Sequence, residues 1–362
     1  MAAGNISTDL KFEELMSYSD VLQKLSRDKK RAKHLIMGNG FSMAYDSKIF
    51  SYNALYNFIE ELNDPVLTKL FKIIDNKNFE LVMQQIDNFI EIAKAFGADE
   101  ELLIKLKAAN QKLQTSLIEA ISSLHPEHVF KIPEEKSKSC AKFLNEFLLN
   151  NGKVFTTNYD LLMYWVLMRN EATKGNDGFG REMLNPEKVI QKQEEPDWSD
   201  LFWGESDEEQ TIFFVHGSLP LFDTGTQILK EVYDTEHYLL DNIKKRMENK
   251  DYPVFVTAGN GDEKLNHIRH NPYLNFCYNQ LSSLEGSLIS FGFNFGEYDE
   301  HIIDAINKAA NNGFTPRDGK RLWSIYIGVY SEDGLEHIKV IQAKFLCKVN
   351  VYNARSANIW GV

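Results

Sequence analysis

Four short segments of this chain place amide, imidazole and carboxylate side chains next to short apolar runs. They are IMGNGFS at 36–42, FTTNYD at 155–160, FFVHG at 213–217 and SFGFNFGEYDEHI at 290–302. Short continuous apolar runs are typical of buried parallel strands, so the polar residues are expected at the carboxyl ends of such strands. Open α/β sheets bind nucleotides at that edge. Together the four segments predict a nucleotide site that contains a candidate pair, Asn158 and His216.

The first segment, Gly38-Asn39-Gly40-Phe41-Ser42, has the glycine spacing of a phosphate-binding turn. Two glycines allow a tight turn and a close approach of the backbone to a phosphate, and a following helix N-terminus offers N–H donors. The third glycine of the dinucleotide fingerprint is missing, because Met43 stands where it would be. A plain tight turn is the alternative, and the other three segments favour the nucleotide interpretation.

The second and third segments supply groups suited to ribose or water. The amide of Asn158, which follows Thr157, can orient a hydroxyl without ionising. Asn158 or Asp160 could instead cap the helix expected to begin at Leu161. The imidazole of His216 can accept a proton near neutral pH, and Gly217 would leave room for a ligand. The alternative for His216 is a buried histidine that is hydrogen-bonded to the backbone.

The fourth segment places Gly292, Phe293 and Asn294 at the end of an apolar run and Asp299 at the start of a helix. A carboxylate there suits the helix dipole, and binding of ribose hydroxyls is the functional alternative. His267 and His270 lie three residues apart, but no carboxylate or cysteine completes a metal site beside them, so we expect no metal.

The elements that must hold these residues alternate between strand and helix. This alternation predicts an α/β fold in which helices cover both faces of a parallel sheet. Helical spacing without a strand candidate over about 51–125 predicts a helical insertion after the first strand, and about 170–210 is a polar excursion. We expect residues 1–362 to form a single domain. The expected strands are 34–38, 153–160, 211–217, 253–259, 287–293, 321–329 and 347–353.

Composition excludes several classes of protein. The net charge of −12 argues against a surface that coats nucleic acid directly. The three cysteines, Cys140, Cys277 and Cys347, form no CxxC pair, which argues against disulfides and a four-cysteine zinc site. No apolar run reaches membrane-spanning length, and the N-terminus lacks the features of a signal peptide. We therefore expect a cytoplasmic protein without a membrane partner.

The motifs GNGFS, TTNYD, VHG and GFNFGEYDEHI resemble those of bacterial sirtuin-like NAD-hydrolysing proteins of antiviral defence. The resemblance runs from about residue 34 to at least 330, and it implies a Rossmann-like fold with a helical insertion. It also implies that Asn158 and His216 are the catalytic pair. The function implied is cleavage of NAD+ to nicotinamide and ADP-ribose, in an NAD-depleting effector of anti-phage defence. The residues then expected to contact NAD are Gly38, Asn39, Gly40, Phe41, Ser42, Thr157, Asp160, Gly217, Gly292, Phe293, Asn294 and Asp299.

The sequence differs from this family's relatives in two features, and these differences argue against some of the possible functions. Deacylating sirtuins carry a zinc module with two CxxC pairs, which this chain lacks, so we expect no zinc and no cofactor beyond NAD as the substrate. The alternatives are a non-catalytic NAD or ADP-ribose sensor and a protein ADP-ribosyl transferase or deacylase. Many homologues attach a sensor domain, for which this chain leaves little length. We therefore expect control by homo-oligomerisation or by a separate regulatory subunit that contacts residues 51–125 or 170–210.

Overall fold

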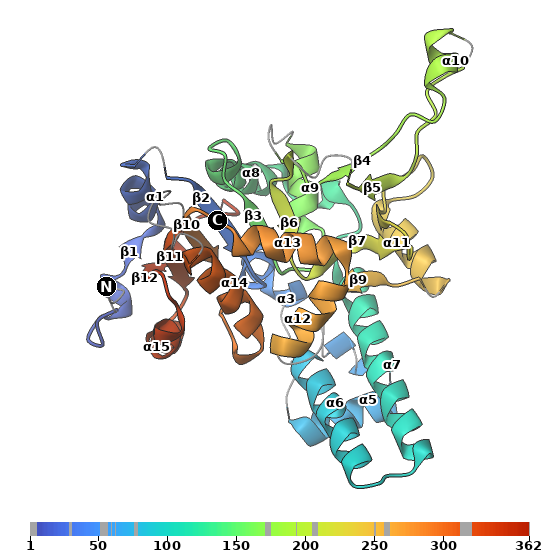
Figure 1. The fold of residues 1–362 in the computed structure, drawn as a ribbon, viewed down its shortest axis with the longest axis horizontal. Helices are drawn as coiled ribbons and strands as arrows, with labels where there is room; N and C mark the ends of the chain where they lie inside the picture. Colours follow the sequence, from blue (N-terminus) through green and yellow to red (C-terminus); the bar gives the residue numbers. More distant parts are fainter. Residues whose placement is uncertain are drawn as a thin grey trace.

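A seven-stranded parallel sheet forms the centre of the protein, as a computed structural model shows (Figure 1). The structure describes residues 6–28, 31–50, 57–58, 60–61, 63–75, 79–170, 175–192, 194–204, 209–249, 251–256, 261–311 and 321–361. The sheet confirms the predicted α/β class. Its strands, in order across the sheet, are β1 (Met16–Ser17), β12 (Lys348–Asn353), β11 (Leu322–Val329), β10 (Gly286–Phe291), β2 (Lys33–Met37), β3 (Val154–Thr156) and β6 (Ile212–Phe214).

The strand order is that of a doubly wound Rossmann sheet. From β2 the chain runs outward to β3 and β6 on one side, and it then returns to β10, β11 and β12 on the other. The direction reverses between β2 and β10, and such a switch point is where these sheets bind ligands. The register brings the carboxyl ends of four strands level, because Phe291 pairs with Met37, Met37 with Thr156, and Thr156 with Phe214. All four motifs therefore meet at one edge.

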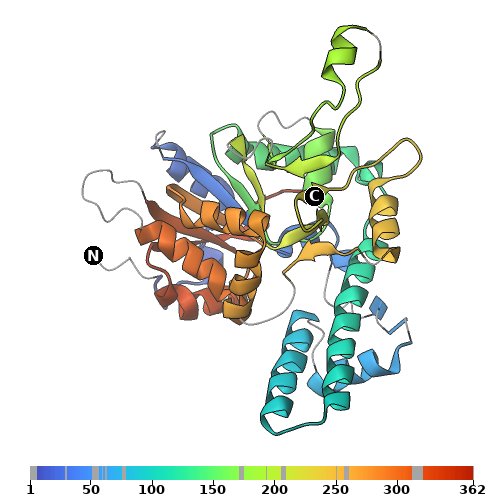
Figure 2. The same ribbon diagram turned by 45° about the vertical axis from the view of Figure 1, so that its right-hand side comes forward.

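Helices cover both faces of this sheet, as the alternation of side chains along the strands requires. Phe291 contacts Phe143 of α8, whereas Phe213, one residue out of step in the register, contacts Phe276 of α13. Figures 1 and 2 show α13 and α14 side by side. The main covering helices are α1 (Tyr18–Ser26), α8 (Glu134–Leu148), α9 (Leu162–Arg169), α12 (Gly261–His270), α13 (Pro272–Ser282), α14 (Glu300–Asn311) and α15 (Glu332–Ile341).

The described part of the segment between β2 and β3 contains helices and their connections but no strand, which confirms the predicted helical insertion. It begins with α2 (Gly40–Tyr45) and α3 (Ser47–Phe50) beside the sheet. The helices α5 (Pro65–Ile74), α6 (Phe79–Ala95) and α7 (Glu100–Leu124) then project away from it (Figure 2). Residues 51–56, 59, 62 and 76–78 of the predicted insertion lie outside the described residues.

A second, antiparallel sheet corrects one prediction and adds detail to another. Its order is β4 (Phe179–Gly180), β5 (Leu201–Trp203), β8 (Ile228–Lys230), β7 (Gly217–Asp223) and β9 (Pro253–Phe255). The segment at 253–259 was expected in the parallel sheet, but its described part pairs with β7, while 257–259 lie outside the described residues. The excursion at 170–210 holds β4 and β5 and carries α10 (Pro186–Ile190) on an outlying arm (Figure 1).

The second sheet follows from the short connection between β6 and β7. Only Val215 and His216 separate the two strands. A parallel return to the same sheet needs a crossover of about a dozen residues, so β7 leaves the sheet and recruits β8 and β9 instead. The next helix is α11 (Leu239–Glu248). No helix among the described residues has the length and apolar character needed to cross a bilayer.

Candidate active site

A cleft of about 1100 Å³ opens at the switch point of the parallel sheet. The loops after β2, β3, β6 and β10 form one part of its wall, and segments after β11 and β12 form another. Residues of α3, α7 and α15 also line it. Most of the residues predicted from the sequence line this one cleft. They are Asn39, Gly40, Thr157, Asn158, Asp160, His216, Gly292, Phe293, Asn294 and Asp299.

The other four predicted residues, Gly38, Phe41, Ser42 and Gly217, do not line the cleft. Phe41 is buried against Trp360, at 5.1 Å between ring centroids. Gly217 has a φ of +82°, and a Cβ there would collide with the carbonyl oxygen of Val254. The missing side chain of Gly217 therefore admits strand β9, whereas the sequence suggested that it admits a ligand.

The glycines after β2 serve loop packing. The N–H of Gly40 donates to the carbonyl of Gly292 at 2.8 Å, and a Cβ on Gly40 would lie 2.5 Å from the Cα of Gly292. The N–H groups of Gly38 and Phe41 also donate, to the carbonyls of Phe291 and Gly38. These three amides are therefore occupied, and the predicted phosphate cradle is not formed by them. The spacing instead brings the loops after β2 and β10 into backbone contact.

Asn158 is held by a buried hydrogen-bonded chain. Its Nδ2 donates to Ser42 Oγ at 2.8 Å, and Ser42 Oγ donates to Asp160 Oδ2 at 2.5 Å. Because the hydroxyl gives its single proton to the carboxylate, it accepts from Asn158, which sets the orientation of the amide. Asn158 Oδ1 is buried and accepts no hydrogen bond from any described residue. The chain therefore leaves one aligned acceptor for a hydroxyl or water in the cleft.

Asp160 combines two roles. Its Oδ1 accepts from the N–H of Leu162, the first residue of α9, at 2.9 Å. The N-cap position itself is Leu161, one residue later than the sequence suggested, so Asp160 supports the helix start from one residue before the N-cap. Burial raises the pKa of this carboxyl, and hydrogen bonds from Ser42 and backbone amides oppose the rise. Ser42 thus orients Asn158 and also stabilises the carboxylate. Its position in the first motif gave no sign of either partner.

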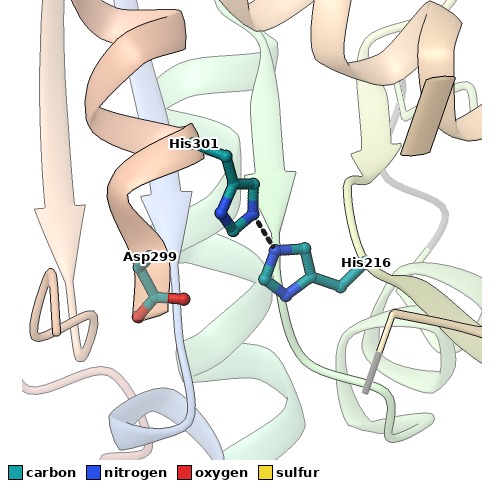
Figure 3. A group of neighbouring side chains, drawn as sticks. All are labelled: His216, Asp299 and His301. Carbon is teal, nitrogen blue, oxygen red and sulfur yellow. Dashed lines mark hydrogen bonds between the residues drawn. The ribbon is translucent and has the colours of Figure 1, made fainter. Parts of the chain in front are cut away.

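His216 is paired with a second histidine, as Figure 3 shows. Its Nε2 lies 2.8 Å from Nε2 of His301, and both rings are buried. Burial, then His301, then Lys264 lower the pKa of His216 well below its usual value. Burial and then Lys264 lower the pKa of His301 to about 3. Both imidazoles are therefore neutral at physiological pH, and neither the ligand-facing nor the backbone-bonded interpretation of His216 anticipated this pair.

Asp299 lies beside the two histidines. One carboxylate oxygen and one nitrogen from each ring lie within 4.8 Å of one another, which is close enough to share an ion. Lys264, which is fully buried, places its Nζ 3.7 Å from Asp299 Oδ1. The ammonium group of Lys264 would repel a divalent cation bound by Asp299. The cluster of His216, Asp299 and His301 is therefore better suited to holding a proton than a metal ion.

Sequence analysis missed a part of the cleft wall that Tyr330, Ser331, Arg355, Asn358 and Trp360 line. They follow β11 and β12, whose ends lie at the same sheet edge as the motifs, and that position was the available signal. Arg355 is the only lysine or arginine among the cleft-lining residues that the structure describes. Its Nε donates to the carbonyl of Tyr330 at 2.7 Å, which holds the guanidinium in place.

Comparison with known proteins adds one match. The family model described as "Domain of unknown function (DUF4917)" matches residues 35–360, which span the parallel sheet from β2 onward and every residue of the cleft named above. A search of curated proteins finds no match.

Proposed function

The chain belongs to the DUF4917 family, and from the cleft described above we propose that it hydrolyses NAD+ to nicotinamide and ADP-ribose. One observation carries the proposal. Asn158 and His216 line a single cleft at the switch point of a Rossmann sheet, and each is held from behind by a buried partner. A nucleotide-binding edge that presents an aligned amide and a neutral imidazole suits cleavage at a ribose.

The proposed reaction breaks the bond between C1′ of the ribose and the nicotinamide nitrogen. The electron pair leaves with nicotinamide, which becomes neutral, and positive charge develops on the ribose. Asn158 Oδ1 accepts a hydrogen bond from a ribose hydroxyl or from the attacking water. His216 takes the proton as the water oxygen bonds to C1′, and it releases that proton to solvent afterwards.

The electrostatics of the cleft support this chemistry. Because the pKa values of His216 and His301 are lowered, both rings are neutral when NAD binds, so His216 has a lone pair with which to accept the proton. The unpartnered Oδ1 of Asn158 costs about 1–3 kcal/mol while it stays unsatisfied, and a bound hydroxyl would recover that cost.

The rest of the cleft suits the adenosine diphosphate half of the substrate. Its volume of about 1100 Å³ slightly exceeds the range of about 300–1,000 Å³ typical of small-molecule sites, as a dinucleotide would require. With Asn158 and His216 at the nicotinamide ribose, the pyrophosphate extends toward the ends of β11 and β12. We assign Arg355 to it, since a guanidinium matches the geometry of phosphate oxygens.

Two substitutions test the catalytic assignment. Asn158→Ala and His216→Ala should each retain NAD binding while lowering turnover at least ~100-fold, the scale expected for a positioned acid–base group. Asn150→Ala and His270→Ala, which alter exposed residues outside the cleft, are the matched controls. Near-normal hydrolysis by both cleft variants would refute the assignment. Stoichiometric NAD binding without product, in the presence of any activating partner, would instead identify a sensor.

Unregulated NAD hydrolysis would deplete the host cell, so we propose that self-assembly or a separate regulatory protein activates the chain. Such control fits an NAD-depleting effector of anti-phage defence. Phe89 and Ile92 of α6 and Phe96, which directly follows this helix, are exposed apolar residues at spacings of three and four, and they suit such a contact. NAD hydrolysis per protomer should therefore rise with protein concentration or with added neighbouring gene products. Full turnover by a dilute monomer would rule this control out.

A further inference from the structure

Only one proton can lie between the two Nε2 atoms of His216 and His301. At 2.8 Å between the two Nε2 atoms, one nitrogen donates and the other accepts. Both rings are buried and lie near the ammonium of Lys264, which disfavours an extra positive charge. Two neutral arrangements remain. Either His216 donates and its Nδ1 is bare, or His301 donates and the Nδ1 of His216 carries the proton.

The surroundings of His301 decide between these arrangements. Its Nδ1 is buried and has no hydrogen-bond partner among the described residues. One carboxylate oxygen of Asp299 and one nitrogen of each ring lie within 4.8 Å of one another, and Figure 3 shows Nδ1 of His301 on the ring edge that faces Asp299. Asp299 ends the short 3-10 turn just before α14, two residues ahead of His301. The carboxylate of Asp299 repels a bare Nδ1 lone pair and attracts an Nδ1–H. Lys264 would favour the bare lone pair, but its ammonium lies 3.7 Å from that carboxylate, which offsets its charge. The proton of His301 therefore belongs on Nδ1, and its Nε2 accepts from His216.

From this juxtaposition we infer that Asp299, His301 and His216 form a relay, in which His301 is the positioning residue that keeps Nδ1 of His216 bare toward the cleft. The inference rests on the proposed function for its catalytic meaning. Nδ1 of His216 lies on the ring edge away from His301 (Figure 3). When this nitrogen takes the proton of water or of a ribose hydroxyl, an O–H bond breaks and an N–H bond forms. The positive charge is then shared with His301 and faces the carboxylate of Asp299.

Lys264 neutralises the charge of Asp299 before any proton is transferred. Its ammonium, fully buried at 3.7 Å from Asp299, balances the carboxylate so that the cluster is neutral overall with both imidazoles uncharged. A zinc ion bound to both Nε2 atoms would require them to lie roughly 3.3 Å apart, from tetrahedral geometry and bonds of about 2.0–2.1 Å. The observed 2.8 Å fits a hydrogen bond instead.

The first test measures the tautomers in the unmodified chain, without any substrate. Histidine labelled with ¹⁵N distinguishes a protonated ring nitrogen from a bare one by its chemical shift and couplings. We expect Nε2–H on His216 and Nδ1–H on His301, assigned with His216→Gln and His301→Gln. The reverse pattern would overturn the relay whether or not the chain cleaves NAD. The expected pattern in a chain that fails to cleave NAD would leave the relay standing and refute the proposed chemistry.

The second test separates positioning from a structural role. His301→Ala should lower kcat for NAD about 10- to 100-fold while KM changes less than about threefold, since the base is misaligned and the binding surface is kept. Added imidazole should restore part of kcat by filling the vacated site. His270→Ala, which changes an exposed histidine on α12, is the control and should change neither constant. A folded His301→Ala variant with unchanged kcat would overturn the assignment.

Discussion

Replacing Ser42 with alanine removes one hydroxyl that serves both Asn158 and Asp160. The variant loses a neutral hydrogen bond from Asn158, worth about 1 kcal/mol, and a bond to a charged carboxylate, worth about 1.5–3 kcal/mol. Ser42 is fully buried, so water does not readily replace either bond. We expect the free energy of unfolding to fall by about 3 kcal/mol, measured by urea denaturation.

The pH dependence of this loss identifies its cause. Burial raises the pKa of Asp160 above its ordinary value of 3.8, and the bond from Ser42 opposes that rise, so Ser42→Ala raises the pKa further. A folded-state pKa above the unfolded value means that the ionised carboxylate costs stability at high pH. This cost disappears as pH falls through the folded pKa. The difference between wild type and variant should therefore be larger at about pH 8 than at acid pH.

The same substitution should lower kcat/KM for NAD about 10- to 100-fold, because the amide of Asn158 is no longer aligned. The matched control is Ser287→Ala, which removes another fully buried hydroxyl, bonded at 3.0 Å to Ser324 at the opposite end of the sheet. It should cost about 1 kcal/mol of stability and leave turnover unchanged. The reasoning about Ser42 fails if Ser42→Ala keeps turnover within twofold of wild type while Asn158→Ala is inactive.

Two further predictions concern stability. Gly292→Ala should lower the free energy of unfolding by at least about 2 kcal/mol, because φ is +64° and the new Cβ would lie 2.5 Å from the backbone nitrogen of Phe41. Gly225→Ala is its control, with φ of +83° and nothing within 4 Å, and it should cost only about 1 kcal/mol in the same denaturation experiment. Acid should also destabilise the protein, because burial lowers the pKa of His34 and His125 to about 4 from 6.5. Both stay neutral in the fold and gain a proton on unfolding, so stability falls with pH below 6.5, by about 2 kcal/mol for each histidine on reaching about pH 5. Urea denaturation above pH 6.5 and at about pH 5 measures this loss of stability. Equal stability at the two pH values would contradict the conclusion that both histidines are buried and neutral.

Local patterns in the chain were enough to predict the parallel sheet and one edge of its site. An apolar run followed by a polar residue marks a strand end, and parallel strands in one sheet present those ends together. The sequence therefore predicted that Asn158, His216 and Asn294 lie near one another, even though the strand order was not known, and all three line the same cleft. The helical insertion was equally readable, because helical spacing over several turns is a local property.

Which side chains form hydrogen bonds with one another was decided only by the tertiary structure. Ser42 and Asp160 are 118 residues apart, and His216 and His301 are 85 residues apart. A local pattern states which end of a strand a residue occupies, but not which loop lies beside it. That neighbour is set by the order and register of β10, β2, β3 and β6, which depend on how the whole chain packs.

The glycines also show which properties follow from the sequence and which depend on the tertiary structure. Their spacing in the first motif was visible in the sequence, and so was the glycine after His216. The structure showed that Gly40 admits Gly292 and that Gly217 admits β9. A missing side chain permits any close approach, by phosphate or by backbone. The sequence alone determined that close approaches occur at these positions, and only the packing of distant strands decided what approaches.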